Sequence, residues 1–175
     1  MSLNDLKIGQ KIAAAFAIVV LLIAGMGAAV FLSIRTMDTA RTDYDAAAQT
    51  RAAVKDAQFF LALQENSYRG FLVSGEPYYI ERVAAHRANF KARLAAVREN
   101  AQDQAETTRL VDQVEAAADA WHLNVVEAGQ ILWRNPATRA DAIGMVAQNG
   151  DADNYMTPAE DGLDALIAQA DETGL

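Results

Sequence analysis

The sequence predicts an all-α protein: an antiparallel, up-down four-helix bundle whose first helix is continuous with an N-terminal transmembrane helix. Three observations lead to this fold. Residues 12–34 read IAAAFAIVVLLIAGMGAAVFLSI, without a charged side chain. The rest of the chain repeats apolar residues at helical spacings, and no segment alternates with the period of a β-strand. The breaks between these segments are short, and short connections join antiparallel neighbours in helical bundles.

The apolar segment 12–34 is long enough to cross a membrane. As a helix it measures about 35 Å, against about 30 Å of hydrocarbon, and a helix satisfies its own backbone hydrogen bonds there. A core helix of a soluble domain would carry a polar stripe, which this segment lacks. A cleaved signal peptide is the alternative, since Lys7 and Lys11 precede the segment. Because signal-peptide apolar regions run only about 7–15 residues, we expect an uncleaved anchor surrounded by membrane lipid.

The flanking charges do not choose an orientation. Lys7 and Lys11 precede the span, and Arg35 and Arg41 follow it. With two basic residues on each side, the positive-inside rule favours neither orientation. A short N-terminal tail usually stays inside. We therefore expect residues 1–11 in the cytoplasm, 12–34 in the bacterial inner membrane, and 35–175 in the periplasm or outside the cell.

Composition argues against several function classes. The net charge of −8 gives nucleic acid binding no electrostatic support. The absence of cysteine excludes disulfides, thiol catalysis, cysteine-ligated zinc and C-x-x-C-H haem attachment. His86 and His122 lack a partner at metal-ligand spacing, and Asp151 and Asp153 match only a fragment of a calcium loop. Without catalytic or phosphate-binding motifs, we expect no enzyme activity, no metal and no cofactor.

The first helix is predicted to continue from Arg35 to about Val73, roughly 58 Å beyond the span. Ser74-Gly75-Glu76-Pro77 is the first break, because glycine permits a turn and proline suits a first helical turn. Along the predicted first helix, apolar and small residues recur at a spacing of three to four: Met37, Ala40, Tyr44, Ala47, Val54, Ala57, Leu61 and Tyr68.

The second helix is predicted from about Glu76 to Ala101, and the third from the turn at 100–103 to about Trp133. Asp103 with Glu106 forms a plausible capping pair at the start of the third. The inward residues of the second are Tyr79, Val83, His86, Phe90, Leu94 and Val97. Those of the third are Leu110, Val114, Ala117, Trp121, Val125, Ala128 and Leu132.

A short segment, Pro136–Gln148, is predicted to begin at an Asn135 cap, and 149–154 reads as a loop. Thr157-Pro158-Ala159-Glu160 has the form of a capping box with proline at the first position, and starts the fourth helix. Its inward residues are Leu163, Leu166, Ile167 and Ala170. Thr157–Leu175 spans only about 28 Å. We therefore expect the domain to be truncated at its C-terminal end and the chain to be the N-terminal part of a longer protein.

The segment Glu65-Asn66-Ser67-Tyr68-Arg69-Gly70-Phe71-Leu72-Val73-Ser74-Gly75-Glu76 resembles the CHASE3 family of extracytoplasmic four-helix sensory domains in bacterial receptors. The basic start at 6–11, Tyr78-Tyr79-Ile80 and the segment 150–156 fit the same pattern, so the resemblance covers roughly residues 40–172. It implies a second span followed by a HAMP relay and a chemoreceptor, histidine kinase or cyclase module. The start is most similar to a methyl-accepting chemotaxis protein. The four-helix chemoreceptor sensor family is the neighbouring alternative.

Four residues are candidates for ligand binding: Glu65, Arg69, Tyr68 and Trp133. Glu65 and Arg69 share a helix face and can form an ion pair, which is common on helices. The functional alternative is that the planar guanidinium of Arg69 binds a ligand carboxylate. Trp133 stands beside the Asn135-Pro136 break, where it can border a pocket or cover the end of the domain. Trp121 follows the apolar register and is predicted to be core.

Taken together, the sequence predicts the sensory region of a membrane receptor, dimeric in the intact protein. An unknown small-molecule or protein stimulus would displace the fourth helix relative to the first. A membrane-tethered module that binds a partner protein and senses no small molecule is the alternative.

Overall fold

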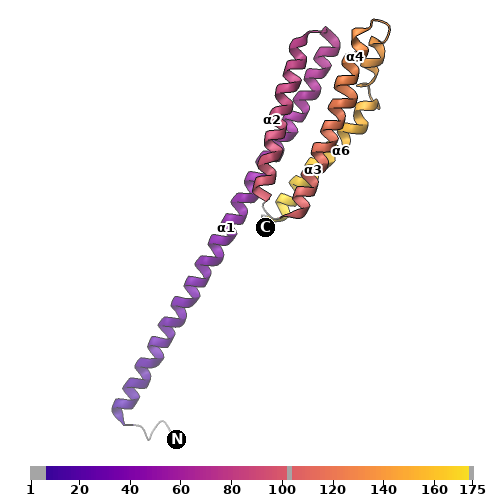
Figure 1. Cartoon of the computed structure of the whole chain (residues 1–175). Helices are drawn as coiled ribbons and strands as arrows, with labels where there is room; N and C mark the ends of the chain where they lie inside the picture. Colours follow the sequence, from indigo (N-terminus) through magenta and orange to yellow (C-terminus); the bar gives the residue numbers. More distant parts are fainter. Residues whose placement is uncertain (1–6, 102–103, 174–175) are drawn as a thin grey trace. The chain divides into compact units, whose positions relative to one another are not determined.

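The computed structural model describes residues 7–101 and 104–173, and within these ranges the secondary structure is helical, with no strand (Figure 1). The all-helical class predicted from the sequence is confirmed. The elements are α1 (Ile8–Ser74), α2 (Pro77–Ala101), α3 (Ala105–Trp121), the π-helical segment η2 (His122–Glu127), α4 (Ala128–Arg134), α5 (Arg139–Gly144) and α6 (Asp151–Thr173).

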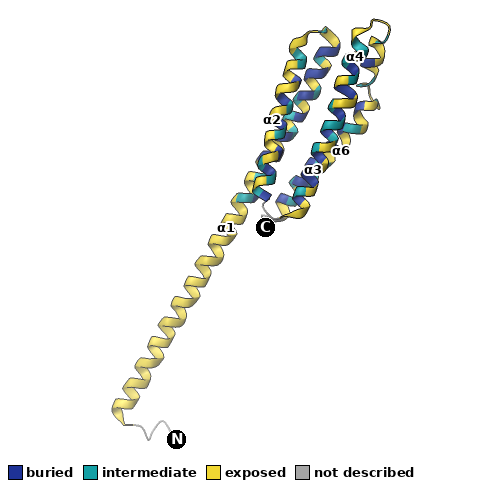
Figure 2. Cartoon of the chain, in the orientation of Figure 1, coloured by how far each residue is buried: buried dark blue, intermediate teal, exposed yellow. Residues whose placement is uncertain are grey.

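The chain divides into two compact units, of which the first ends at Asp43 and contains the N-terminal part of α1. Every described residue of this unit is exposed (Figure 2). Its apolar window has a mean hydropathy of 2.7, so α1 is long and apolar enough to cross a membrane. Large apolar side chains on all sides of one helix are unfavourable in water. The exposed apolar helix of the first unit therefore indicates that this is a membrane protein.

The second unit, from Tyr44 onward, contains one hydrophobic core to which α1, α2, α3, η2, α5 and α6 contribute. The sequence periodicity identifies most of this core correctly. Fully buried members include Val54, Tyr68, Phe90, Val97, Val114, Trp121, Val125 and Leu163. The predicted apolar face of the first helix is not buried at its start: Met37, Ala40 and Tyr44 are exposed, and burial along α1 begins at Ala47.

Polar contacts establish which helices of the second unit are neighbours. Asp56 of α1 pairs with Arg93 of α2 at 3.4 Å, and Gln58 of α1 donates to Asp164 of α6 at 2.7 Å. Ion pairs join α2 to α3: Arg87–Asp119, Lys91–Asp119, Lys91–Glu115, Arg98–Asp112 and Arg98–Glu115. A second contact exists for each of the first two pairs: Phe60 of α1 lies beside His86 of α2, and Arg51 of α1 pairs with Asp171 of α6. In all three pairs, residue numbers that rise on one helix fall on its neighbour, so each pair of helices is antiparallel.

The turn between α1 and α2 agrees with the prediction. Helix α1 ends at Ser74, and Gly75 has a φ of 74°, a backbone conformation that side chains with a Cβ rarely adopt. The N–H of Gly75 donates to the carbonyl of Phe71 at 2.7 Å, which closes the helix end. Pro77 begins α2 without losing an intrahelical bond.

The predicted third helix exists, but it is not a regular α-helix. The six residues of η2 form a π-helical segment between α3 and α4. A π-bulge inserts a residue into the register, so Gly129 is buried where a regular helix would have placed Ala128. Gln104 precedes the first turn without a side-chain cap. The predicted capping partner Asp103 lies outside the described residues, and Glu106 bonds Arg109 instead.

The predicted loop at 149–154 is confirmed only for residues 149–150, and the predicted start of the fourth helix at Thr157 is wrong. Helix α6 begins at Asp151, which places Pro158 inside it. The carboxylate of Asp153 accepts from the N–H of Asn149 at 2.9 Å, and Asp151 and Asp153 both favour the positive end of the helix dipole. The hydrogen bond of Asp153 and the two charges in the first turn stabilise a helix that begins before the apparent capping box. Proline then costs one backbone bond near the beginning of the helix.

The short segment between α4 and α6 is confirmed in reduced form. Of the predicted range 136–148, residues Arg139–Gly144 form helix α5. The predicted Asn135 cap is wrong: α5 begins at Arg139, and Thr138 precedes it without a side-chain cap. Asn135 ends α4 instead, and its side-chain oxygen accepts from the N–H of Ala137 at 3.0 Å in the turn that follows.

Candidate functional site

Two side-chain hydrogen bonds connect the end of α1 to the π-helical segment and α4. The Tyr68 hydroxyl donates to the carbonyl of Val125 at 2.9 Å. The indole N–H of Trp133 donates to the carbonyl of Leu72 at 3.2 Å. Two of the four candidate residues thus position the end of the domain that carries the α1–α2 turn.

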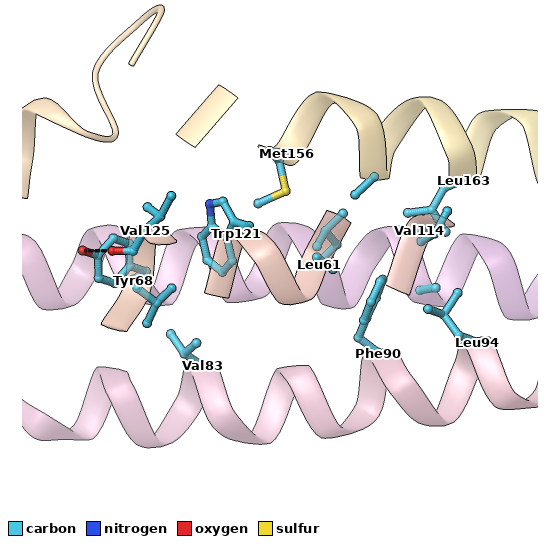
Figure 3. Packing of buried hydrophobic residues seen from close by; sticks show 14 of the residues in the cluster. Leu61, Tyr68, Val83, Phe90, Leu94, Val114, Trp121, Val125, Met156 and Leu163 are labelled. Atoms are coloured by element: carbon cyan, nitrogen blue, oxygen red, sulfur yellow. Dashed lines mark hydrogen bonds between the residues drawn. The ribbon is translucent and has the colours of Figure 1, made fainter. Parts of the chain in front are cut away.

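Tyr68 is fully buried, and Figure 3 shows its hydroxyl bonded to Val125 and its ring near Trp121. It meets Trp121 edge-on at 6.1 Å and stacks on Phe71 at 6.2 Å, measured between ring centroids. Burial raises the pKa of Tyr68 to about 12, so the hydroxyl remains a hydrogen-bond donor at physiological pH. Its inaccessibility makes Tyr68 a structural residue of the site and prevents direct contact with a ligand in this conformation.

The π-helical segment is shaped around the Tyr68 hydroxyl. The carbonyl of Val125 accepts from both Tyr68 and the N–H of Ala128. A Cβ atom on Gly129 would lie 1.8 Å from the Tyr68 oxygen, so only glycine fits this position. Because π-bulges occur frequently at functional sites, η2 is a candidate for a region that changes conformation.

Arg69 and Glu65 form the ion pair that their spacing predicts, with a nitrogen–oxygen distance of 2.6 Å. Arg69 also lines a cavity of about 420 Å³, whose remaining lining is apolar: Leu72, Val73, Ile143, Val146 and Ala147. Glu65 lies near a second carboxyl group, that of Glu160. The pKa of Glu160 is raised first by burial and then by the charge of Glu65 and of three neighbouring aspartates. Each partner of the ion pair therefore has a second neighbour: Arg69 lines the cavity, and Glu65 lies near Glu160.

Trp133 lines a different cavity, of about 360 Å³, at the α1–α2 turn. Phe71 packs against its ring at a centroid distance of 5.1 Å, and the guanidinium of Arg139 lies 4.2 Å from its centroid. Gly75 approaches so closely that a Cβ atom there would lie 2.0 Å from the indole ring. The indole is therefore held in place as a wall of this cavity, whose lining is Phe71, Gly75, Pro77, Ile80, Glu81, Gln130, Trp133 and Arg134.

The structure does not gather the four candidates into one pocket. Arg69 and Trp133 line separate cavities, and Tyr68 is buried in the core. The sequence reasoning missed Glu81, Gln130 and Arg134, the polar residues beside Trp133. They come from α2 and α4, and no spacing along the sequence shows that these two helices border one cavity. Trp121 is fully buried, as predicted.

The two histidines differ in their charged neighbours: His86 lies beside Arg82, and His122 lies 3.4 Å from the carboxylate of Glu127. Burial lowers the pKa of His86, and the charge of Arg82, whose guanidinium lies 3.3 Å from the ring, lowers it further. Burial also lowers the pKa of His122. Both rings therefore favour the neutral form in the folded protein.

Comparison with protein families identifies one match: the CHASE3 domain, over residues 37–173. Searches of curated proteins and of solved structures returned no match.

Proposed function

The chain belongs to the CHASE3 domain family, extracellular sensory domains of signalling receptors, and on this basis we propose that it is the sensory region of a bacterial transmembrane receptor. The observation that carries the proposal is the course of α1. This one helix contains the candidate membrane span and also supplies core residues of the domain, from Ala47 to Leu72.

In this proposal α1, α2, the third helix and α6 form an antiparallel four-helix bundle outside the inner membrane, in the periplasm or outside the cell. The polar contacts between α1 and α2, α2 and α3, and α1 and α6 support such a ring of helices. Close packing between α3 and α6 completes it, because Gly162 lies against Val114. The N-terminal residues 1–11 remain in the cytoplasm, and the receptor functions as a homodimer.

The proposed mechanism is a displacement of α6 relative to α1. The side-chain contacts between these helices, Gln58–Asp164 and Arg51–Asp171, are exposed, and exposed polar contacts exchange for water at little cost. The core bonds at Tyr68 and Trp133 couple α1 instead to η2 and α4. A stimulus needs to bias this equilibrium by only about 1–3 kcal/mol to change the output.

A chemoreceptor is the output that we favour, on the resemblance of residues 6–11 and the following span to the start of a methyl-accepting chemotaxis protein. A histidine kinase or a cyclase receptor is the alternative. The region itself performs no chemistry in this proposal, and its stimulus is a small molecule or a protein. A membrane-tethered module that only binds a partner protein is the competing function.

Cross-linking tests the mechanism in the receptor that carries this region. These 175 residues contain no cysteine, so in a receptor whose remaining cysteines are replaced by serine, a pair introduced at Arg51 and Asp171 can be joined by a bifunctional maleimide. We expect the α1–α6 cross-link to abolish the response to stimulus. A matched pair at Arg98 and Asp112 joins α2 to α3 and leaves the response intact. An unchanged response with α1 joined to α6 contradicts the mechanism.

A second test addresses transmission along α1. Replacing Arg35 and Thr36 by two glycines loosens the helix between the span and the domain. If signalling survives this change undiminished, a rigid α1 is not the transmitting element. The partner-binding alternative predicts survival, because a tether needs no stiffness.

A further inference from the structure

The cavity beside Trp133 combines two opposite charges with an apolar wall. Glu81 of α2 and Arg134 of α4 line it together with the amide of Gln130. Apolar atoms come from Phe71, Pro77, Ile80 and the Trp133 ring. A small number of polar groups placed around an apolar cavity is the usual composition of a ligand site.

The two charged groups of this cavity are free to bind a ligand. Within residues 7–101 and 104–173, the side chains of Glu81 and Arg134 make no hydrogen bond and no ion pair. Most other arginines of the domain are paired with carboxylates: Arg51, Arg69, Arg87, Arg93, Arg98 and Arg109. The larger cavity at Arg69 differs in this respect, because its single cation is already bonded to Glu65.

The fixed Trp133 ring determines where a positive group can be bound. The guanidinium of Arg139 lies over this ring at 4.2 Å, and its Nε donates to the Trp133 carbonyl at 3.2 Å. A ligand cation is therefore repelled from the Arg139 side of the indole and attracted to Glu81. A ligand carboxylate matches the planar guanidinium of Arg134.

From this arrangement we propose that the cavity binds a free α-amino acid with an apolar side chain, its ammonium group at Glu81 and its carboxylate at Arg134. The side chain lies against Phe71, Ile80 and Trp133. A volume of about 360 Å³ suits a single small zwitterion. The inference rests on the proposed sensory function and names its ligand class.

An occupant of this cavity touches the end of α1, one of the two helices in the proposed displacement, together with α2 and α4. Gly75 and Pro77 belong to the α1–α2 turn, and Trp133 is hydrogen-bonded to Leu72 at the end of α1. Gln130 and Arg134 follow the π-helical segment along the same continuous helix. Binding therefore biases the contact between α1 and the third helix directly.

Isothermal titration calorimetry of the full chain in lipid nanodiscs tests the proposal. The probes are L-phenylalanine and L-leucine, with 3-phenylpropanoate and 2-phenylethylamine as analogues that lack one charged group each. We expect saturable binding of both amino acids, and at least tenfold weaker binding of each analogue, because one charge-assisted contact is lost. Equal binding of an analogue, or no binding of either amino acid, overturns the proposal.

Substitutions locate the binding. Glu81→Gln and Arg134→Gln should each weaken amino acid binding at least tenfold. The controls are Glu99→Gln, on α2 outside the cavity, and Lys55→Gln, on the exposed face of α1; both should bind as the natural chain does. Far-ultraviolet circular dichroism verifies that all four variants keep their helix content. Unchanged affinity in both cavity variants overturns the assignment.

The outcome is distinguishable from failure of the proposed function. If neither amino acid binds but the α1–α6 cross-link still abolishes the receptor's response, the ligand class is wrong and the sensory function stands. If amino acids bind at Glu81 and Arg134 but the cross-link changes no response, the binding site stands and the mechanism fails.

Discussion

Gly129→Ala tests whether the π-helical segment is built around the Tyr68 hydroxyl. In an ordinary helix this substitution stabilises by about 0.8–1.0 kcal/mol, because alanine is the better helix former. Here the new methyl group would lie 1.8 Å from the Tyr68 oxygen. Tyr68 is 0% exposed, so its ring has no solvent-filled space into which to move.

Two costs oppose the gain in helix propensity. Overpacking a core costs about 1–3 kcal/mol, and a displaced Tyr68 loses its bond to Val125, worth about 0.5–1.5 kcal/mol. We expect a net destabilisation of about 1–3 kcal/mol. In a Tyr68→Phe background the nearest atoms to the methyl group are a ring carbon at 3.1 Å and the Met145 sulfur at 3.7 Å. There the substitution should cost at least about 1 kcal/mol less, because a shift of a few tenths of an ångström removes the remaining overlap.

Urea unfolding in detergent micelles measures the four proteins of this double-mutant cycle. Both tryptophans, Trp121 and Trp133, lie in the second unit, so indole fluorescence reports its unfolding alone. We expect a coupling free energy of at least about 1 kcal/mol. Gly144→Ala is the control, since no atom lies within 4 Å of the added methyl group, and it should not destabilise. Equal costs of Gly129→Ala in the two backgrounds would refute the reasoning.

Three further predictions concern stability. Gly75→Ala should destabilise by about 1–3 kcal/mol in urea unfolding, because Gly75 has a φ of 74° and a methyl group there would lie 2.0 Å from the Trp133 ring; unchanged stability would contradict the assigned turn. The pKa of Glu160 is raised by burial and by acidic neighbours, so the folded state favours its protonated form and loses stability as pH rises through that pKa. Glu160→Gln should therefore stabilise at pH 7, with a gain that shrinks below pH 4.5, and a loss of stability at pH 7 would oppose this account. The pKa of His86 is lowered by burial and by Arg82, so its contribution to the free energy of unfolding should be fully present above about pH 6.5 and be lost as pH drops below that value. His86→Phe should flatten this dependence in thermal melts between pH 5 and 8. An unchanged slope would assign the pH dependence to other groups.

Much of the fold could be predicted because helices follow local rules. The apolar repeats of α2 and α3 place Phe90, Val97, Val114 and Trp121 in the core, and the Gly75 turn follows from local backbone chemistry. Each of these inferences depends on residues close in sequence, where periodicity and turn preferences determine the structure.

The errors arise where distant contacts compete with local signals. Thr157 to Glu160 has the form of a capping box, but the Asp153 carboxylate caps an earlier start of α6, and the proline is tolerated. The π-bulge at η2 depends on Tyr68, a residue of another helix. No local pattern encodes that contact.

The candidate site was predictable only in part for the same reason. Arg69 and Trp133 could be selected as residue types that bind ligands, and each lines a cavity. Their assignment to separate cavities depends on how α1, α4 and α5 meet. Glu81 and Arg134 lie more than fifty positions apart, so only the packing of α2 and α4 identifies them as neighbours of one cavity.

Site-directed maleimide labelling in intact cells tests most directly whether residues 35–175 form an extracytoplasmic domain anchored by residues 12–34. These 175 residues contain no cysteine, so after labelling and purification of the protein, single substitutions at the exposed positions Gly9 and Glu99 report the two sides of the span. A membrane-impermeant maleimide should label Glu99→Cys in intact cells, and Gly9→Cys only after the inner membrane is permeabilised. Labelling of Gly9→Cys alone in intact cells, or equal protection of both positions, would contradict an extracytoplasmic sensory domain.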